Sequence, residues 1–270
     1  MRAFVFKSIF LAAIFVSFVV AVVAVIAQPA ELKPSAGNVF AGEVLKYDAK
    51  FKKILTGITV AELTMSAAKM ANGSDLSLKA DAVSKGTLLR LFRFSFLQQY
   101  ESTIDPAFRI LKSTKHDVQR ERVRDSEAIF DYGQKRVSYT ESDPKDLSRP
   151  PRRMASEIGD HVFDILSAVY YLRLMPLAVG KKYELSVSDS GLVYRVPVTV
   201  TARESQKTIL GNVWCYRIEP DVFGPGRLIE QKGSMVIWMA DDARHTPVRS
   251  QINAEVGKID IKLKSATPAK

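Results

Sequence analysis

The sequence predicts a mainly β (α+β) fold, in which a curved antiparallel sheet or half-barrel is wrapped around one principal helix at about residues 160–174. Two long series of segments alternate between apolar and polar residues, as strands with one buried face do. Turn signals such as Asn72-Gly73 separate these segments. Between the two series, residues 159–180 have a helical period, and this helix is expected to cover the apolar face of the sheet.

The N-terminus has the features of a secretory signal peptide. Arg2 and Lys7 flank the start of an apolar region that continues without interruption over residues 8–27. We expect cleavage after Ala27, which makes residues 1–27 a signal peptide and places the rest of the chain in the periplasm. An uncleaved anchor in the inner membrane is the alternative, because about 20 apolar residues can also span a bilayer.

The charge and cysteine content narrow the classes of partner. The formal net charge is +10, and loss of the two basic residues of the signal peptide lowers it to +8. A basic exported protein is expected to meet anionic lipid or another envelope component rather than nucleic acid. Cys215 is the single cysteine, so an internal disulfide and lipidation at the cleavage site are both excluded. We expect Cys215 to be packed within a strand.

The first series of predicted strands follows a short linker at residues 28–40. Leu45, Tyr47, Ala49 and Phe51 alternate with polar residues and predict the first strand of an antiparallel meander. Residues 87–96 read either as a central strand or as a short helix followed by a strand. Segments 108–124, 128–132 and 136–141 are more polar, which predicts a position near the sheet edge or over a wet cavity. The other strands expected in this series cover residues 58–67, 76–82 and 100–105.

The helix is expected after a long exposed connection. Residues 142–158 contain three prolines and a run of arginines, so they are not expected in the sheet. Asp160 is placed as the N-cap of the helix and Asp164 near the positive end of its dipole. An apolar stripe at helical spacing consists of Phe163, Leu166, Val169, Tyr170 and Leu172.

Strands resume after the helix and complete a single β-rich domain over residues 41–265, followed by a tail at 266–270. Alternation predicts the second series at residues 183–187, 192–200, 214–218, 235–239, 248–256 and 259–263.

Four motifs stand out along the chain: G-E-V-L-K-Y at 42–47, D-I-L-S-A-V-Y-Y-L-R at 164–173, the Leu210-Gly211 turn with residues 215–220 beyond it, and I-W-M-A-D-D-A-R-H-T-P-V at 237–248. Together they resemble the exported bacterial proteins grouped as domain of unknown function 3108, over about residues 40–265. The resemblance implies a secreted or periplasmic, β-rich protein without an assigned activity, so no functional residue carries over. The expected layout is similar to that of the periplasmic lipoprotein carriers, which is an architectural analogy.

A set of large apolar side chains is the first candidate site. A strongly curved sheet with one helix can leave a hollow on its concave side, which would suit an acyl chain. The alternative is ordinary core packing. The residues expected to line such a cavity are Phe92, Phe94, Phe96, Phe163, Leu166, Tyr170, Trp214 and Trp238, with Tyr171 beside them.

A basic patch is the second candidate. Arg120, Arg122 and Arg124 alternate, which places them on one face of a strand, and Arg149, Arg152 and Arg153 add charge in the Pro-rich connection. Arginines can hold phosphate groups through bidentate hydrogen bonds. The alternative is a solvated face that nearby acidic residues balance.

No group of residues predicts a metal site, a cofactor or a catalytic centre. His161 near Asp164 falls short of the three or four ligands that zinc needs, and Ser167 lacks the glycines of a nucleophile elbow. His245 beside Asp241 reads as part of a turn between strands. The sequence therefore favours a non-catalytic binding or carrier-like protein for an apolar or lipidic envelope ligand, or an envelope-assembly factor. A protein-interaction or structural module that uses its sheet edge or basic loop is the alternative, and an enzyme comes third.

Overall fold

The computed structural model describes residues 39–52, 58–71, 73–86, 90, 94–255 and 257–269. The expected signal peptide, most of the linker, Phe92 and most of segment 87–96 lie outside these residues. In the described part of the chain, no helix is long and apolar enough to cross a membrane.

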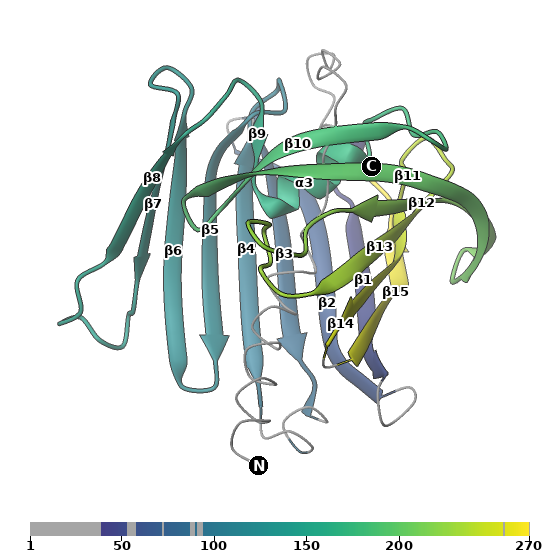
Figure 1. The fold of residues 1–270 in the computed structure, drawn as a ribbon, viewed down its shortest axis with the longest axis horizontal. Helices are drawn as coiled ribbons and strands as arrows, with labels where there is room; N and C mark the ends of the chain where they lie inside the picture. The colour runs from purple at the N-terminus through teal and green to yellow at the C-terminus, as the bar shows by residue number, and fades with distance from the viewer. Residues whose placement is uncertain are drawn as a thin grey trace.

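One sheet contains fifteen strands of the described chain, and Figure 1 shows how strongly it curves. The predicted mainly β fold with an open, curved sheet is confirmed. The first and last strands pair in its middle, and all neighbours are antiparallel except β9 and β10. The order across the sheet is β8-β7-β6-β5-β4-β3-β2-β1-β15-β14-β13-β12-β11-β10-β9. The bounds are β1 Val44–Lys52, β2 Ile58–Lys69, β3 Leu76–Ser84, β4 Phe96–Ile104, β5 Ile110–Gln119, β6 Arg122–Asp131, β7 Arg136–Ser142, β8 Arg152–Glu157, β9 Val162–Phe163, β10 Lys182–Asp189, β11 Leu192–Thr208, β12 Gly211–Pro220, β13 Gly233–Ala240, β14 Pro247–Ala254 and β15 Gly257–Thr267.

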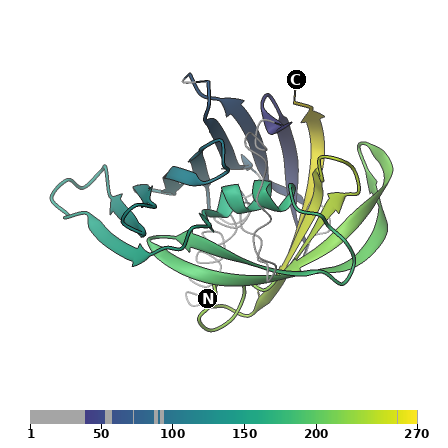
Figure 2. The ribbon, with the colours of Figure 1, turned by 90° about the horizontal axis from the view of Figure 1, so that it is seen from above.

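The two ends of the sheet approach each other at the turn between β10 and β11. The terminal strands β8 and β9 follow one another in the chain but do not pair. Instead, Ser156 Oγ on β8 donates a hydrogen bond of 2.7 Å to the carbonyl oxygen of Gly191 in that turn. Figures 1 and 2 show β10 and β11 running across toward the β7–β8 end. We call this junction the seam.

The seam depends on a glycine. Gly191 has a φ of +82°, and an added Cβ would lie 2.8 Å from the Cβ atoms of Met154 and Tyr139. Gly191→Ala is therefore expected to lower the free energy of unfolding by about 1–3 kcal/mol, because it adds both backbone strain and a clash. Urea denaturation measures the loss. Gly180→Ala is the matched control, since Gly180 has a φ of +87° and open space around it. Equal losses in the two variants would contradict close packing at the seam.

The helix is shorter than expected and begins later. Helix α3 covers Ile165–Leu172, and its N-cap is Asp164, which forms a capping box with Ser167. The prediction of a helix over about 160–174 with Asp160 as N-cap is thus wrong in its bounds and its cap. The physical reason is that Val162 and Phe163 pair as a short strand with Ser186 and Val187, which keeps the chain extended up to Asp164.

All eight residues of α3 are buried, not only the predicted stripe. Figure 2 shows the helix between the strands β2–β4 on one side and β10–β11 on the other, and α3 contacts β3, β4, β9 and β10. A helix that is apolar all round is stable only when it is covered on every side. One continuous cluster of buried apolar side chains extends from Phe40 to Leu263.

Two further predictions are corrected. The connection at 142–158 contains β8, whose Met154 packs against the core while Arg153 and Ala155 stay exposed. Segment 108–124 is not one strand, because β5 ends at Gln119 and β6 begins at Arg122. The alternation signals of the remaining strands agree with the structure, although β11 continues beyond the expected 192–200 and β15 continues to Thr267, into the expected tail at 266–270.

Candidate functional site

A polar pocket lies at the seam. Its cavity of about 40 Å³ has room for about three water molecules. Strands β4 to β7 contribute lining residues from one part of the sheet. The end of β10 and the turn after it contribute lining residues from the other part, and the start of α3 lies between them. All lining residues except Ala128 and Ile165 carry a polar side-chain group. The lining residues of this seam pocket are Tyr100, Ser113, Thr114, Lys115, Ser126, Ala128, Tyr139, Asp164, Ile165, Ser188, Asp189 and Ser190.

Lys115 supplies a positive charge to the seam pocket. It lies on β5, and its Nζ is 5.0 Å from the centroid of the Tyr100 ring. Burial lowers the pKa of Lys115, but its interactions with Tyr100, Asp189 and Asp117 outweigh burial and hold the pKa above its ordinary value. The carboxylates of Asp189 and Asp117 favour the charged ammonium form of Lys115.

Asp164 is the carboxylate at the floor of the pocket, and it is 7% exposed. It accepts hydrogen bonds from Ser102 Oγ at 2.5 Å and from the backbone N–H of Ser167 at 2.7 Å. Burial nevertheless raises the pKa of Asp164, although each of these hydrogen bonds favours the charged form. The seam pocket thus combines one lysine with two aspartates, Asp164 and Asp189.

The raised pKa of Asp164 predicts a pH-dependent stability. A carboxyl group whose folded-state pKa lies above its unfolded value of about 3.9 stabilises the fold fully below that value and loses this contribution as the pH rises through the folded pKa. Asn caps helices as well as Asp does. Asp164→Asn is therefore expected to gain stability relative to the wild type as the pH rises from 4 to 7, measured by urea denaturation at both pH values. Asp160→Asn, an exposed change nearby, is the control, and an unchanged difference for Asp164→Asn would contradict the prediction.

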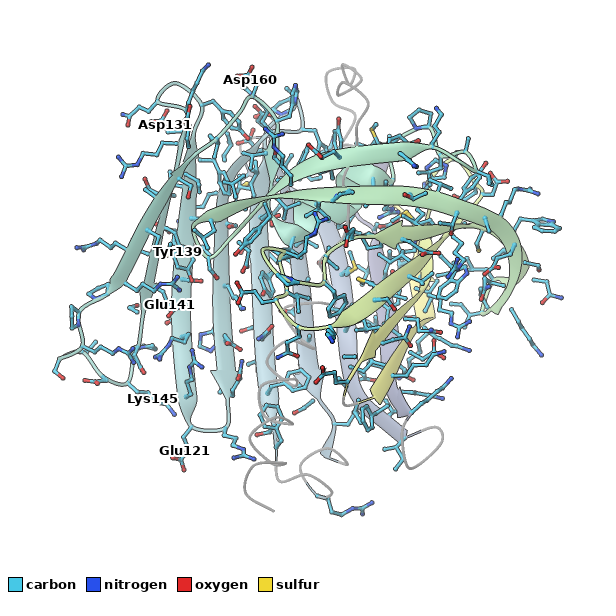
Figure 3. The ribbon with its side chains drawn as sticks, viewed as in Figure 1. Glu121, Asp131, Tyr139, Glu141, Lys145 and Asp160 are labelled. Atoms are coloured by element: carbon cyan, nitrogen blue, oxygen red, sulfur yellow. The ribbon has the colours of Figure 1, made fainter. Side chains whose placement is uncertain are left out.

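Tyr139 on β7 lines the seam pocket and lies beside Gly191 of the β10–β11 turn. Its hydroxyl group donates a hydrogen bond of 3.0 Å to Glu141 Oε2, and Figure 3 shows both residues on the same strand. Burial raises the pKa of Tyr139, so the phenol stays protonated. The guanidinium group of Arg152 lies 6.0 Å from the ring centroid. These contacts fix Tyr139 where β7 meets the β10–β11 turn.

Most of the large apolar side chains predicted to line a cavity belong to the continuous buried core. Phe94 and Phe96 are packed with ring centroids 6.1 Å apart, and Phe92 lies outside the described residues. Phe163, Leu166 and Tyr170 are 0–2% exposed. Tyr171 packs against Phe163, with ring centroids 4.3 Å apart.

Trp214 lies apart from this core, which corrects its assignment to the cavity lining. Trp214 is 53% exposed, and the guanidinium group of Arg203 lies 4.7 Å from its ring centroid. Trp238 belongs to the buried core and donates its indole N–H to Glu204 on β11. A large aromatic residue in a strand indicates a packed side chain, but the sequence does not show which face of the sheet that side chain is on.

The predicted basic patch is also divided. Arg120 lies in the β5–β6 turn with a φ of +57°, so the three alternating arginines do not share one strand face. Arg124 forms ion pairs with Asp143 at 2.6 Å and with Glu141 at 3.4 Å. The exposed members are Arg120 in the β5–β6 turn, Arg122 on β6, Arg149 between β7 and β8, and Arg152 and Arg153 on β8. An Arg-Glu dipeptide at 120–121 carries no turn signature, which is why the hairpin was missed.

Sequence reasoning did not single out Lys115, Tyr139, Asp189 or the serines of the pocket. The available signal was the polar character of segments 108–124 to 136–141, which predicted an edge position or a wet cavity. The edge position is confirmed, because β8, β7 and β6 are the last strands at one end of the sheet. Strands β5 and β6 also line the seam pocket. What the alternation did not show is that the β10–β11 turn closes the pocket.

The remaining candidates have structural partners. Ser167 Oγ donates to the carboxylate of Asp164 within the capping box, and His245 Nδ1 lies 2.9 Å from the carbonyl oxygen of Arg173. Cys215 is fully buried in β12, as expected, and burial raises the pKa of its thiol to about 11. Among the described residues, no group of three or more His, Cys, Asp or Glu residues could hold a metal ion.

The fold places the chain among mainly β proteins that have one open, strongly curved sheet. A solved structure of a β-barrel-like protein of domain of unknown function DUF1849 from Brucella abortus is similar, with a TM-score of 0.55 and 11% identity over 85% of this chain and 98% of that chain. At this identity the likeness shows the fold alone. The chain belongs to the family of proteins of unknown function DUF3108, whose model matches residues 46–264. The resemblance inferred from the four motifs is thereby confirmed.

Two further solved structures are less similar. A protein with a YmcC-like fold from Bacteroides fragilis has a TM-score of 0.32 and 11% identity, over 84% of this chain and 96% of that chain. A hypothetical protein from Chlamydia trachomatis has a TM-score of 0.31 and 6% identity, over 86% and 90%. No curated protein matches the chain.

Proposed function

We propose that this chain is a non-catalytic, exported binding protein that holds the polar head group of a lipidic envelope ligand in the seam pocket. In this proposal the sheet acts as a half-barrel around α3, by analogy with the periplasmic lipoprotein carriers. The observation that supports it best is the position of the pocket. A lysine and two aspartates meet there, at the seam, where the two terminal strands of the sheet do not pair.

The charges favour a zwitterionic head group. Lys115 would pair with a phosphate group, and Asp189 or Asp164 with an ammonium group, while the surrounding serine hydroxyls can donate or accept. Because the cavity measures only about 40 Å³, a complete head group enters only when the β10–β11 turn moves away from β7 and β8. The apolar tail would then contact Phe94, Phe96, Phe163, Leu166 and Tyr170, which are packed in this conformation.

The test is a search for bound lipid followed by a matched pair of variants. Protein recovered from the envelope fraction should carry lipid that native mass spectrometry and solvent extraction identify, and it should bind a fluorescent zwitterionic phospholipid. Lys115→Met is expected to weaken that binding about tenfold, because a charge-assisted hydrogen bond is lost. Lys112→Met is the control, since Lys112 lies on the same strand but outside the pocket, where it pairs with Glu127. Absence of any lipid, or equal binding by the two variants, would refute the proposal.

A second function, as a protein-interaction module, is favoured by the end of the sheet. Strand β8 is terminal, and its Arg153, Ala155 and Glu157 side chains are exposed. A terminal strand can accept a strand from another chain. A pull-down from envelope extracts, repeated with Arg149, Arg152 and Arg153 changed to Ala, tests this function. An unchanged set of partners would argue against the basic segment as the contact surface.

A further inference from the structure

The ribbon formed by β11 and β12 ends in a tip that extends past the rest of the sheet. Strand β12 pairs with β13 only over Cys215–Ile218, whereas its pairing with β11 continues to Thr208 and Gly211. Figures 1 and 2 both show the far end of this ribbon at the periphery of the molecule. Beyond Cys215, β12 is therefore paired with β11 but not with β13, and the tip can contact another surface.

Two large aliphatic residues occupy the turn of this tip. Ile209 and Leu210 connect the paired residues Thr208 and Gly211, and they are 51% and 49% exposed. Gly211 supplies the left-handed backbone conformation of this turn, with a φ of +93°, and neither Ile209 nor Leu210 has a positive φ, so the turn does not require these two side chains. The fold does not bury these side chains, so turn formation and core packing do not account for them.

The surroundings of the turn match the chemistry of a membrane interface. Trp214 is 53% exposed close behind the turn, and Lys207 is exposed on the adjacent strand. Residues 205–218 contain no Asp or Glu, and the guanidinium group over the Trp214 ring is that of Arg203, which pairs with Asp241. Tryptophan is enriched at membrane–water interfaces, and lysine near a bilayer is attracted to anionic head groups.

Two backbone polar groups of the turn form hydrogen bonds with the side chain of Thr208. The Leu210 N–H donates to Thr208 Oγ1 at 2.9 Å, and the Thr208 hydroxyl donates to the Gly211 carbonyl oxygen at 3.1 Å. Leaving a polar group without a partner in an apolar medium is costly, and these bonds remove part of that cost. Together with the convex shape of a hairpin end, they favour a lipid surface over a protein groove.

We propose that Ile209, Leu210 and Trp214 form a membrane-contact tip that inserts into the interface of an anionic lipid bilayer, with Lys207 contacting lipid phosphate groups. This contact is separate from the seam pocket and does not require the proposed binding function. It would hold one end of the ribbon at the membrane while leaving the seam free.

The natural tryptophans provide the test, because the chain has two and Trp238 is buried. The exported protein, in the form recovered from cells, is mixed with vesicles of phosphatidylglycerol and phosphatidylcholine that carry brominated acyl chains. We expect the bromines to quench part of the tryptophan fluorescence. Trp214→Phe should abolish this quenching, because the remaining Trp238 does not reach the bilayer. This readout reports on the tip and is not affected by membrane contact through the N-terminus.

Three further variants sharpen the result. Ile209→Ser combined with Leu210→Ser should raise the lipid concentration for half-maximal quenching about tenfold or more, because the inserted apolar surface is removed. Lys207→Gln should raise it about fivefold at low salt. Leu147→Ser is the matched control, since Leu147 is 90% exposed in a different loop and should have no effect. Absence of quenching, equal quenching in Trp214→Phe, or equal quenching by phosphatidylcholine vesicles would overturn the proposal.

Discussion

Replacing Arg173 by methionine is expected to lower the free energy of unfolding by about 3–5 kcal/mol, because it leaves the carboxylate of Glu43 buried without a partner. Both side chains are almost completely inaccessible, at 0% exposed for Arg173 and 2% for Glu43. Two parallel hydrogen bonds join them, from Nη1 to Oε2 at 2.6 Å and from Nη2 to Oε1 at 2.7 Å. A buried charge that loses its partner retains the cost of desolvation.

The other contacts of Arg173 increase the expected effect. Its Nε–H donates to the carbonyl oxygen of Arg244 at 3.0 Å, and its guanidinium group lies 4.3 Å from the ring centroid of Phe40 and 5.0 Å from that of Tyr170. Burial lowers the pKa of Arg173, but Glu43 outweighs burial and raises it, so the pair is ionic. The single side chain therefore joins the end of α3 to the segment before β1 and to the β13–β14 connection.

Urea denaturation of three variants distinguishes an ionic pair from simple packing. Glu43→Leu combined with Arg173→Met should be more stable than Arg173→Met alone, because neither charge is then left unpaired. Arg203→Met is the control, since Arg203 pairs with Asp241 on the surface and should cost at most about 1 kcal/mol. If the double variant were less stable than Arg173→Met, packing and not charge would explain the loss.

Replacing Leu166 by alanine is expected to cost about 2–5 kcal/mol, since Leu166 is fully buried in α3 and the neighbouring strands are held by the sheet ladder. A rigid surrounding structure cannot collapse into the space that the removed atoms leave. Leu192→Ala, at the exposed start of β11, is the control and should change stability by about 0.5 kcal/mol or less.

Combining stability with lipid binding separates two roles of Leu166. A large loss of stability with unchanged lipid affinity per folded molecule indicates a core residue. If Leu166→Ala were nearly as stable as the wild type but lost its lipid, α3 would line a binding cavity, and the expectation for stability would be wrong. Thermal denaturation and the fluorescent phospholipid assay provide the two measurements.

The pattern of the chain was sufficient for most of the strands and for the family. In β1, for example, Leu45, Tyr47 and Ala49 alternate with polar residues and are 1%, 4% and 1% exposed. Strand alternation is a local property, because the pleat sends successive side chains to opposite faces. The same pattern missed β8, whose flanking prolines and arginines resemble those of an exposed connection.

The candidate site was predictable only in part. The polar character of β5 and β6 indicated either a sheet edge or a wet cavity, and Asp164 was placed near the start of the helix. The partners of Lys115 could not be inferred, since Asp189 lies 74 positions further along the chain and reaches the pocket only through the β10–β11 turn. The division of Trp214 and Trp238 between different surroundings likewise depends on which strands pair.

The sequence by itself determined the class of fold, the alternating strands, the burial of the segment around Leu166 and membership in the DUF3108 family, because these follow from residue type and local spacing. Only the tertiary structure decided that the first and last strands pair, that the ends of the sheet meet at Gly191, and that Glu43 and Arg173 form a buried pair. The physical reason is that contacts between residues far apart in the chain depend on the register and curvature of the whole sheet, which local periodicity does not specify.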